Sequence, residues 1–452
     1  MLSHDSEIII VGGGVFGLSS ALWLARGGYR NITIFDRCAF DKNGYDPSRG
    51  CDGASADINK VFRMAYAERT DYQDLAIEAR DFWLSWNKAI TEANISDLPG
   101  SLTPEDKLFY ICGSYFLAEG PELRDYYADS LKTMEKTAPE FRKMQFVKAC
   151  IYAKFLCEQV GVKFVLGDPK GKLSSLIIEN DGLNKRVAGI KTCDGLRHFG
   201  DLVIVAAGSW TASIIPEAHQ TVEATAGTVM FIDIPKHRQD LWKKFHPDNY
   251  PVWSYRRGEG EESVYSIFTR DVVLTLMLAT TRVVDSRSPK KGDSSSAFAA
   301  VNRVSTPRTK YTEKRINTVP LYGLSRMKEV ISQAFPELAE FGFTDSRLCW
   351  YTDSIDNDYV IDYVPGYSDS LFICTGGSGH AFKFLPVLGK HVKNQIERVP
   401  DQFTSVWKWR VAQQGKPNNG LSEGEDGPRE MSKLEMASAQ DFKMKRVPMQ
   451  KL

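Results

Sequence analysis

The sequence predicts an α/β fold in which a Rossmann-like domain, built on a parallel sheet, is interleaved with a second domain. The first observation is the short, apolar, β-branched run Glu7–Val11, which leads directly into a glycine-rich stretch over residues 12–17. The second is that residues 90–145 and 225–344 lack such signals and alternate polar with aromatic residues. We expect these two segments to form a mixed sheet covered by helices. With 452 residues the chain is long enough for two or three domains.

Composition excludes several classes of protein. The chain is 42% hydrophobic and 25% charged, and it has 57 basic and 57 acidic residues, so its formal net charge is zero. Such a balance disfavours a dedicated nucleic-acid or membrane-surface binder, because phosphate-driven binding needs clustered positive charge. The 8 cysteines form no CxxC pair, so we expect neither a metal site nor a disulfide scaffold. Scattered cysteines of this kind indicate a reducing compartment.

The glycine-rich stretch has the spacing of a dinucleotide-binding loop. Residues 12–17 read Gly-Gly-Gly-Val-Phe-Gly, which matches GxGxxG between the first strand and a helical run over residues 18–26. A second strand is expected over residues 31–35, closed by Asp36. The residues expected to contact the dinucleotide are Gly12, Gly14, Val15, Phe16, Gly17 and Asp36.

Each of these positions has a physical reason. Gly12 permits the tight turn, Gly14 lets the backbone approach a pyrophosphate, and Gly17 allows close contact between helix and strand. The helix N-terminus supplies amide donors to the phosphates. Asp36 is placed to accept the ribose hydroxyls, and its charge would repel a 2′-phosphate, which disfavours NADP. The motif by itself leaves FAD and NAD open.

Later segments carry a resemblance to a known family. They are a buried strand with a small-residue turn over 201–210, a strand over 161–167, Arg-Leu-Cys-Trp over 347–350, and Ser-Gly-His-Ala-Phe-Lys-Phe-Leu-Pro over 378–386. In this order they resemble the monomeric sarcosine oxidase family of FAD amine oxidases. Within it they resemble the fungal branch of fructosyl amino acid oxidases (amadoriases) and saccharopine or pipecolate oxidases. The resemblance spans about residues 6–410 and is loose between 230 and 330.

The resemblance implies six segments. The FAD-binding domain takes 1–89, 146–224 and 345–414, and an interleaved mixed-sheet substrate domain takes 90–145 and 225–344, as in amine oxidases and D-amino-acid oxidases. Residues 415–452 are rich in Gly, Pro, Asn, Ser, Glu and Lys, and we expect them to be extended or disordered.

The resemblance also implies how FAD is held. Cys349 matches the cysteine that carries the 8α-S-cysteinyl link to FAD, although a cysteine beside a tryptophan is by composition more often a buried small hydrophobe. The glycines of residues 376–379 match a loop against the isoalloxazine, followed by a helical run from His380 whose end stabilises the anionic reduced flavin. Cys374 is expected to be core. The other residues expected to contact the cofactor are Arg37, Lys60, Val165, Ala207, Gly208, Trp210, Gly377, Gly379, His380, Phe382 and Lys383.

Three basic residues are the candidate catalytic groups. By resemblance, Lys60 lies near flavin N5, while Arg63 and Lys383 hold the substrate carboxylate, for which the planar fork of arginine is well suited. The alternative for these residues is a solvated basic surface. The family has a lysine over the other flavin face that promotes the reaction with oxygen, but here Thr275 stands at that position. Either the alignment slips or oxygen activation lies elsewhere, with Lys60 as the candidate. Tyr66 is nearby but has no assigned role.

These features predict an FAD-dependent oxidase that acts on the C–N bond of a secondary-amine (N-alkyl) amino acid. Hydride transfer to flavin N5 gives an iminium and, with O2, hydrogen peroxide, and the iminium hydrolyses or cyclises, the latter in natural-product biosynthesis. Alternatives are a fructosyl amino acid oxidase or a saccharopine or pipecolate oxidase. The acidic, sugar-facing loop of amadoriases is absent, and the charged stretches at 256–262 and 290–296 are expected to be solvated loops. More remote alternatives are an NAD-dependent dehydrogenase and a non-catalytic FAD-binding protein.

Cellular location and assembly leave weaker signals. Residues 8–25 are the most apolar stretch, but glycines interrupt it, and neither a membrane span nor a signal peptide is predicted. The last three residues, Gln450, Lys451 and Leu452, resemble a peroxisomal Ser-Lys-Leu signal. We expect a cytoplasmic or peroxisomal monomer whose partners are a small N-substituted amino acid and O2.

Overall fold

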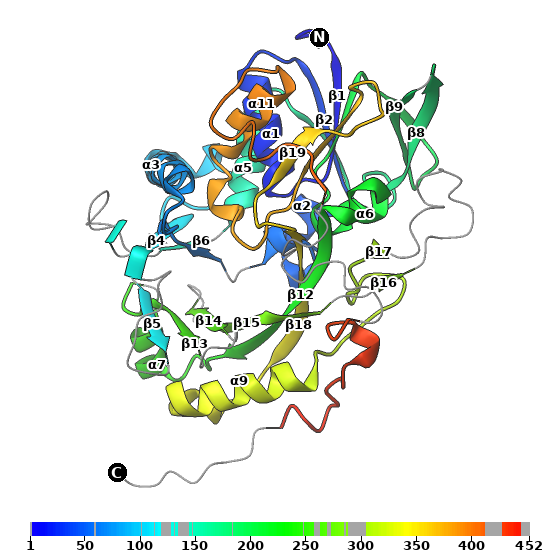
Figure 1. Cartoon of the computed structure of the whole chain (residues 1–452). Coiled ribbons are helices and arrows are strands. Elements are labelled where there is room, and N and C mark those ends of the chain that lie inside the picture. Colours follow the sequence, from blue (N-terminus) through cyan, green and yellow to red (C-terminus); the bar gives the residue numbers. More distant parts are fainter. Residues whose placement is uncertain are drawn as a thin grey trace, which may run out of the picture.

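The computed structural model describes most of the chain (Figure 1). The described residues are 2–57, 60–100, 102–112, 114–118, 128–130, 132–133, 144–146, 148–182, 184–246, 248–256, 263–268, 273–283, 286–287, 304–411 and 427–443. The charged stretches expected to be loops at 257–262 and 290–296, and the last three residues, lie outside this part.

The first domain is built on a six-stranded sheet with the order β19-β20-β11-β1-β2-β7. All neighbouring strands are parallel except β19, which runs antiparallel to β20. The carboxyl ends of the parallel strands therefore meet at one edge. The bounds are β1 Glu7–Val11, β2 Asn31–Asp36, β7 Lys163–Leu166, β11 Leu202–Val205, β19 Val360–Tyr363 and β20 Leu371–Thr375.

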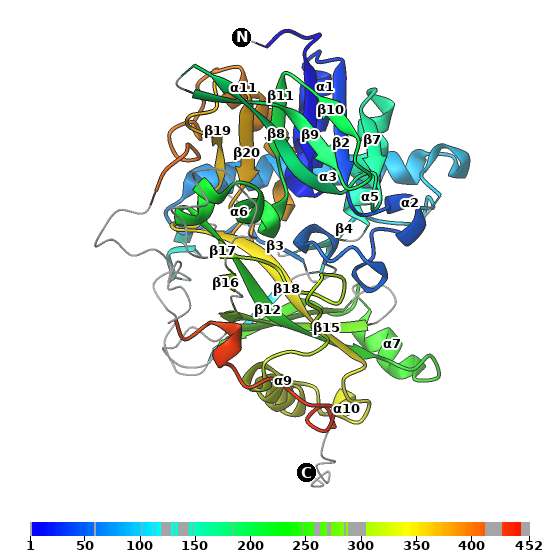
Figure 2. The same cartoon turned by 90° about the vertical axis from the view of Figure 1, so that its right-hand side faces the viewer.

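Both faces of this sheet are covered, which explains why β1 is an unbroken apolar run. Ile8 and Ile10 pack into the cluster that contains helix α1, whereas Ile9 and Val11 pack into a cluster with residues of β9. Figures 1 and 2 show α1, α3, α5 and α11 on one side, and the twisted sheet β10-β9-β8 together with α6 on the other. The bounds are α1 Val15–Arg26, α2 Phe40–Asn43, α3 Thr70–Glu92, α5 Ala149–Gln159, α6 Thr211–Ile214, α11 Leu388–Ile396, β8 Leu173–Asp181, β9 Asn184–Thr192 and β10 Arg197–Phe199.

Two helical expectations need correction. Helix α1 begins at Val15, directly after the N-cap Gly14, and so includes three residues assigned to the loop from sequence. The expected helical run from His380 is wrong, because residues 382–384 form only a short 3-10 turn. Helix α11 begins at Leu388, after Pro386, whose ring removes an amide donor and clashes with a preceding turn. The N-terminus of a regular helix is therefore not part of the 376–379 loop.

The second domain is built on a six-stranded sheet with the order β18-β12-β15-β14-β13-β5. Its strands are antiparallel, apart from the parallel pair β13 and β5. The bounds are β5 Ser114–Ala118, β12 Val222–Asp233, β13 Val252–Arg256, β14 Ser263–Phe268, β15 Val273–Val283 and β18 Asp345–Ser354. The remaining elements are β3 Val61–Phe62, β4 Phe109–Ile111, β6 Met144–Phe146, β16 Ser286–Arg287, β17 Val304–Ser305, α7 Gln239–Phe245, α9 Leu321–Ala334 and α10 Pro336–Ala339.

One face of this sheet packs on α9 and the other faces the first domain (Figure 1). Trp350 of β18 belongs to the buried cluster that contains Leu324 and Met327 of α9. Its neighbour Cys349 points the other way and packs with Val229 and Ala54. The alternation of side chains along a strand thus presents residues 347 and 349 to the space between the domains. This fold confirms the predicted class, a Rossmann-like domain interleaved with a mixed-sheet domain.

Residues 427–443 run along α9 mostly as turns, with one 3-10 helix over Met431–Lys433 (Figure 2). The amide of Leu321 donates to the Glu435 carbonyl at 2.8 Å, and the amide of Ala437 donates to the Val319 carbonyl at 2.9 Å. Met431 is buried in the cluster under the sheet. Among the described residues, no helix is both long and apolar enough to cross a membrane.

Candidate functional site

The glycine-rich loop lies at the carboxyl edge of the first sheet, between β1 and α1. Gly12 has φ of +108°, and a Cβ there would lie 2.4 Å from the carbonyl oxygen of Ala206. A Cβ on Gly17 would lie 1.8 Å from the carbonyl oxygen of Gly12. Glycine is therefore required at both positions, because any side chain there would collide with the protein's own backbone. The loop residues Val15 and Phe16 form the first turn of α1, whose N-terminal amides face this edge.

Asp36 ends β2 beside this loop. Its Oδ2 accepts a hydrogen bond from the Gly13 amide at 2.5 Å, and its Oδ1 accepts one from the Cys38 amide at 2.7 Å. Burial raises the pKa of Asp36, while these two amides lower it. The carboxylate is thus fixed at the carboxyl end of β2, next to the glycine-rich loop. A ribose of a bound dinucleotide would lie there.

Other residues predicted at this edge gather around Arg37. The Arg37 guanidinium lies 4.7 Å from the centroid of the Trp210 ring and forms an ion pair with buried Asp52. Ala207 and Gly208 form the turn that follows β11, and Gly208 has φ of +54° with open space beyond it. Val165 of β7 pairs with Phe35 of β2, so it lies one strand further along the same edge.

The loop over 376–379 follows β20 and reaches the same place. Gly376 and Gly379 have φ of +73° and +72°, and Gly377 is in contact distance of Phe16, since a Cβ there would lie 3.4 Å from the phenyl ring. Cys374, which lies three residues before Gly377, is fully buried in the core, as expected. The structure therefore brings the first and the last glycine-rich segments of the chain together.

Cys349 lies at the centre of a buried cluster of charged groups. The side chain of Arg347, two residues earlier on β18, forms an ion pair with Asp57, with 2.9 Å between Nη2 and Oδ1. Burial raises the pKa of the Cys349 thiol, and the charge and hydrogen bond of Asp57 raise it further, whereas Arg347 and Lys60 lower it. The thiol is therefore protonated at rest and hydrogen-bonded to a carboxylate.

Lys60 completes this cluster. Its ammonium donates to the carbonyl oxygen of Asp57 and lies 4.2 Å from the centroid of the Phe382 ring. Burial lowers the pKa of Lys60, against the raising effect of the Asp57 charge. Because Phe382 follows the 376–379 loop, Lys60 links the cysteine cluster to that loop.

Lys383 and Arg63 lie around Tyr66. The Lys383 ammonium donates to the Tyr66 hydroxyl at 2.6 Å and to the Arg63 carbonyl oxygen at 3.1 Å. Its backbone carbonyl accepts a hydrogen bond of 2.7 Å from the Trp83 indole. The Arg63 guanidinium lies 5.4 Å from the centroid of the Tyr66 ring. Lys383 is only 2% exposed, so the alternative of an ordinary surface lysine is wrong.

A family profile that matches most of the chain decides the family. Residues 7–395 match the profile of a family described as FAD dependent oxidoreductase, which is most of the chain. The chain belongs to this FAD-dependent oxidoreductase family. Membership favours FAD over NAD as the dinucleotide and confirms the prediction of an FAD-dependent oxidoreductase.

Individual relatives agree with the predicted resemblance. The chain is 25% identical to L-saccharopine oxidase of Schizosaccharomyces pombe over 89% of this chain and 93% of the relative. It is 23% identical to monomeric sarcosine oxidase of Streptomyces avermitilis, with 86% and 93% covered. Its fold is similar to fructosamine oxidase (Amadoriase II) of Aspergillus fumigatus, with a TM-score of 0.71, 21% identity and 97% and 98% covered. The predicted resemblance is thereby confirmed.

The residues present fit FAD. Gly12 and Gly17 let the loop and α1 lie close against the strands, where a Cβ would strike backbone oxygens. The α1 N-terminus and Asp36 suit a pyrophosphate and a ribose. Trp210 and Arg37 lie further along the same edge, while Cys349 and the 376–379 loop lie on the side toward the second domain. The arrangement of these residues is therefore compatible with an elongated dinucleotide such as FAD.

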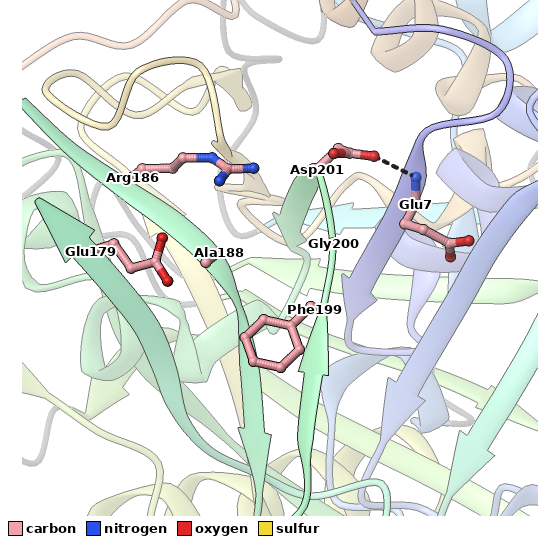
Figure 3. Close-up of a pocket in the computed structure, with 7 residues that line it drawn as sticks. All are labelled: Glu7, Glu179, Arg186, Ala188, Phe199, Gly200 and Asp201. Atoms are coloured by element: carbon pink, nitrogen blue, oxygen red, sulfur yellow. Dashed lines mark hydrogen bonds between the residues drawn. The ribbon is translucent and has the colours of Figure 1, made fainter. Parts of the chain in front are cut away.

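A surface hollow of about 310 Å³ lies elsewhere and is not the FAD site (Figure 3). Its lining includes Glu7 and Asp201, whose carboxylate accepts a 2.9 Å hydrogen bond from the Glu7 amide. Glu7 begins β1, so the hollow lies at the amino end of the strands. Ligands of open α/β sheets bind at the opposite, carboxyl end.

Sequence reasoning left several site groups without a role. Asp57 received no role from the sequence, because only the tertiary structure shows that its side chain faces β18. Arg347 had a clearer signal, because residues i and i+2 of a strand share a face and Cys349 was already singled out. Thr275 lies in β15, and β12 separates that strand from β18.

Proposed function

We propose that this protein oxidises the C–N bond of a secondary-amine (N-alkyl) amino acid. The observation that supports it best is the buried cation Lys383, whose ammonium lies beside Arg63 and next to the 376–379 loop. Two cations at the flavin end of an FAD site suit a substrate with a carboxylate. The names of the relatives, saccharopine oxidase and sarcosine oxidase, agree with such a substrate.

The bound FAD supplies the chemistry of accepting a hydride at N5 and passing two electrons to O2, which gives hydrogen peroxide. The protein holds the substrate. Arg63 and Lys383 bind the carboxylate and thereby fix the C–H of the N-bound carbon in one place, which is a proximity effect. The Trp83 indole anchors the backbone of Lys383, and the surrounding aromatic side chains keep water away. The product is an iminium, which hydrolyses or closes a ring.

We further propose that FAD is attached to Cys349. Support comes from the position of the thiol, which is buried and hydrogen-bonded to Asp57 at the flavin end of the site. A thiol reacts as its thiolate, so a carboxylate that can take the proton is the group required. Asp36, Arg37, Trp210 and the other predicted contacts then hold the remainder of the cofactor without covalent bonds.

Lys60 is the proposed oxygen-activating residue. The reaction of reduced FAD with O2 passes through negatively charged oxygen species, which a nearby cation stabilises. Thr275 offers no charge at the position of the family lysine. Lys60, half-buried and next to Phe382, is the candidate cation on this side of the site.

The test is anaerobic reduction of the FAD by a panel of amines. Sarcosine, N-methyl-L-tryptophan, L-pipecolate, saccharopine and fructosyl-valine are each mixed with the holoenzyme, and bleaching of the flavin absorbance is followed. We expect bleaching by at least one N-alkyl amino acid and none by the matching amine that lacks a carboxylate. Bleaching by fructosyl-valine alone would favour the amadoriase alternative, and bleaching by NADH alone would contradict the proposal.

Domain limits, assembly and location remain proposals. We propose the division at residues 89, 145, 224, 344 and 414, a monomeric state, and delivery to peroxisomes or cytoplasm. Limited proteolysis tests the domain limits, and analytical ultracentrifugation tests the monomeric state. A fluorescent fusion with and without the last three residues tests the location.

A further inference from the structure

We propose that Lys383, Tyr66 and His380 form a proton path between the substrate-binding end of the site and its solvent-facing edge. The inference rests on the proposed function, because it needs an amino acid bound at Lys383. The Lys383 ammonium lies 2.6 Å from the Tyr66 hydroxyl, which lies 3.0 Å from Nδ1 of His380. Nε2 of His380 lies 2.8 Å from the carbonyl oxygen of Asn357.

The bonds of this path all point in one direction. A carbonyl oxygen only accepts, so Nε2 of His380 must carry a proton toward Asn357, and Nδ1 of the neutral ring is then an acceptor. An ammonium only donates, so the Tyr66 hydroxyl accepts from Lys383 and gives its own proton to Nδ1. The donors therefore run outward, from Lys383 through Tyr66 and His380 to Asn357.

Burial decreases along the same direction. Lys383 is 2% exposed and Tyr66 is 8% exposed, whereas His380 is half-buried and lies between exposed Gly379 and the exposed Asn357. The inner end is thus sealed from water and the outer end reaches it. A buried group of this kind exchanges protons with solvent only through other side chains.

The proposed reaction needs such a path twice per turnover. A secondary amine is an ammonium in neutral water, and it must lose one N–H proton before the hydride leaves the adjacent carbon. Reduction of O2 to hydrogen peroxide by the reduced flavin later takes up one proton. The substrate ammonium and O2 therefore give the iminium and hydrogen peroxide with no net proton released.

The outward step balances atom by atom. Lys383 gives a proton to the Tyr66 oxygen as Tyr66 gives its own proton to Nδ1 of His380, and the Nε2 proton leaves to water beside Asn357. While Lys383 is neutral, Arg63 supplies the charge that holds the carboxylate. The lysine amine then takes a proton from the substrate's ammonium nitrogen, which in an α-amino acid is bonded to the same carbon as the carboxylate. When O2 is reduced, the recharged Lys383 gives one proton to the peroxide that forms. The inward step, which is the reverse of the outward one, then protonates Lys383 again and restores the Nε2–H ring for the next turnover.

The charges around His380 keep it neutral at rest. Burial lowers the pKa of His380 well below its usual value, and the positive charge of Lys383 lowers it further. The ring therefore passes a proton without storing it. The titratable and charged groups that face His380 are Tyr66, Tyr72, Tyr359, Lys383, Arg63 and Arg69.

A neighbouring tyrosine provides the matched control. The Tyr359 hydroxyl also lies close to Nδ1 of His380, at 2.9 Å, whereas the Lys383 ammonium donates to the Tyr66 hydroxyl and to the Arg63 carbonyl oxygen. Tyr66→Phe interrupts the path, whereas Tyr359→Phe removes a hydroxyl on the same nitrogen and leaves the path intact. Both variants delete one buried oxygen, so their effects on packing are comparable.

The first measurement is the rate of anaerobic flavin reduction against pH, with whichever panel amine reduces the wild type fastest. We expect Tyr66→Phe to slow reduction by at least about ten-fold at pH 7, with little change in substrate affinity. The defect should shrink as the pH approaches about 10, because the substrate then arrives as neutral amine. Tyr359→Phe should stay within about three-fold of wild type throughout. Equal losses in both variants, or a loss in Tyr66→Phe that does not change with pH, would overturn the proposal.

The second measurement is independent of turnover. The chain has 7 histidines, and a ¹⁵N-histidine spectrum of the holoenzyme, with His380→Gln to assign the signal, reports the protonation of each ring nitrogen. We expect a neutral His380 with its proton on Nε2 between pH 6 and 8. A charged ring, or a proton on Nδ1, would contradict the path even if every panel amine reduced the flavin. If no panel amine reduces the flavin, the proposed function is wrong, and the protonation of His380 still tests the proton path independently.

Discussion

Arg347 and Asp57 form a buried ion pair, with 2.9 Å between Nη2 of the guanidinium and Oδ1 of the carboxylate. Their side chains are only 12% and 4% exposed, and the pair joins β18 of the second domain to the segment that follows the 3-10 turn Ala54–Ala56. Cys349 lies on the same face of β18 as Arg347. The ion pair therefore fixes the carboxylate of Asp57 next to the one cysteine that the sequence singled out.

Attachment of FAD through Cys349 has a direct test. In acid-precipitated wild-type protein the yellow colour should stay in the pellet, and in Cys349→Ala it should move to the supernatant as free FAD. Cys374→Ala is the matched control, because Cys374 is equally buried but lies in the core of the first sheet. Colour that leaves the wild-type pellet would remove Cys349 from the site, and a protein without any flavin would contradict FAD binding.

Breaking the ion pair should destabilise the fold. Asp57→Asn leaves the Arg347 charge buried without its carboxylate, which costs about 3 kcal/mol or more. Asp369→Asn is the control, because the Arg398–Asp369 pair is 65% and 59% exposed. Exposed pairs contribute about 1 kcal/mol or less. Thermal unfolding should therefore show a clear decrease in Tm for Asp57→Asn and almost none for Asp369→Asn, and equal changes would contradict the assigned burial.

The lowered pKa of Lys60 predicts how oxygen reactivity depends on pH. The lysine is charged below its pKa, so the rate of reoxidation by O2 should be high at low pH and fall as the pH rises. Because burial lowers that pKa, the fall should occur below the value of about 10.4 that is usual for lysine. Stopped-flow mixing of the reduced enzyme with O2 measures this rate.

Variants of Lys60 separate charge from shape. Lys60→Met should slow reoxidation by about 10²-fold and remove the pH dependence, because the cation is lost. Lys60→Arg should retain activity to higher pH, since a guanidinium stays charged. A Lys60→Met enzyme with an unchanged rate would show that oxygen is activated by another residue.

The glycine loop predicts a sharp contrast between two substitutions. Gly17→Ala would place a Cβ 1.8 Å from the Gly12 carbonyl oxygen. Helix α1 must then move away from the strand, which disrupts the glycine-rich loop. Gly53→Ala meets nothing within 4 Å and serves as the control. We expect FAD bound per chain to fall at least about ten-fold in Gly17→Ala, which corresponds to only 1.4 kcal/mol, and to be unchanged in Gly53→Ala. The ratio of flavin to protein absorbance measures both.

Much of the fold was predictable because its signals are local. About thirty residues contain the order strand, glycine loop, helix, strand and acid. This order predicts which edge of the sheet binds the cofactor, and the spacing of the glycines predicts which of them lie against backbone. Element limits were less accurate. Helix α1 began three residues earlier than expected, and the run from His380 proved to be a turn because Pro386 prevents a continuous helix.

The sequence by itself determined the family and the Rossmann-like domain with its glycine-rich loop, because short, contiguous motifs specify them. The residues at the flavin end stay a prediction from the same kind of motif. Only the tertiary structure decided how those residues act on one another. Tyr66 and His380 are 314 positions apart, and Tyr66 and Lys383 are 317 apart, yet they are hydrogen-bonded. The crossing of the chain between two sheets creates these contacts, and the pairing of distant side chains leaves no periodic pattern in a single sequence.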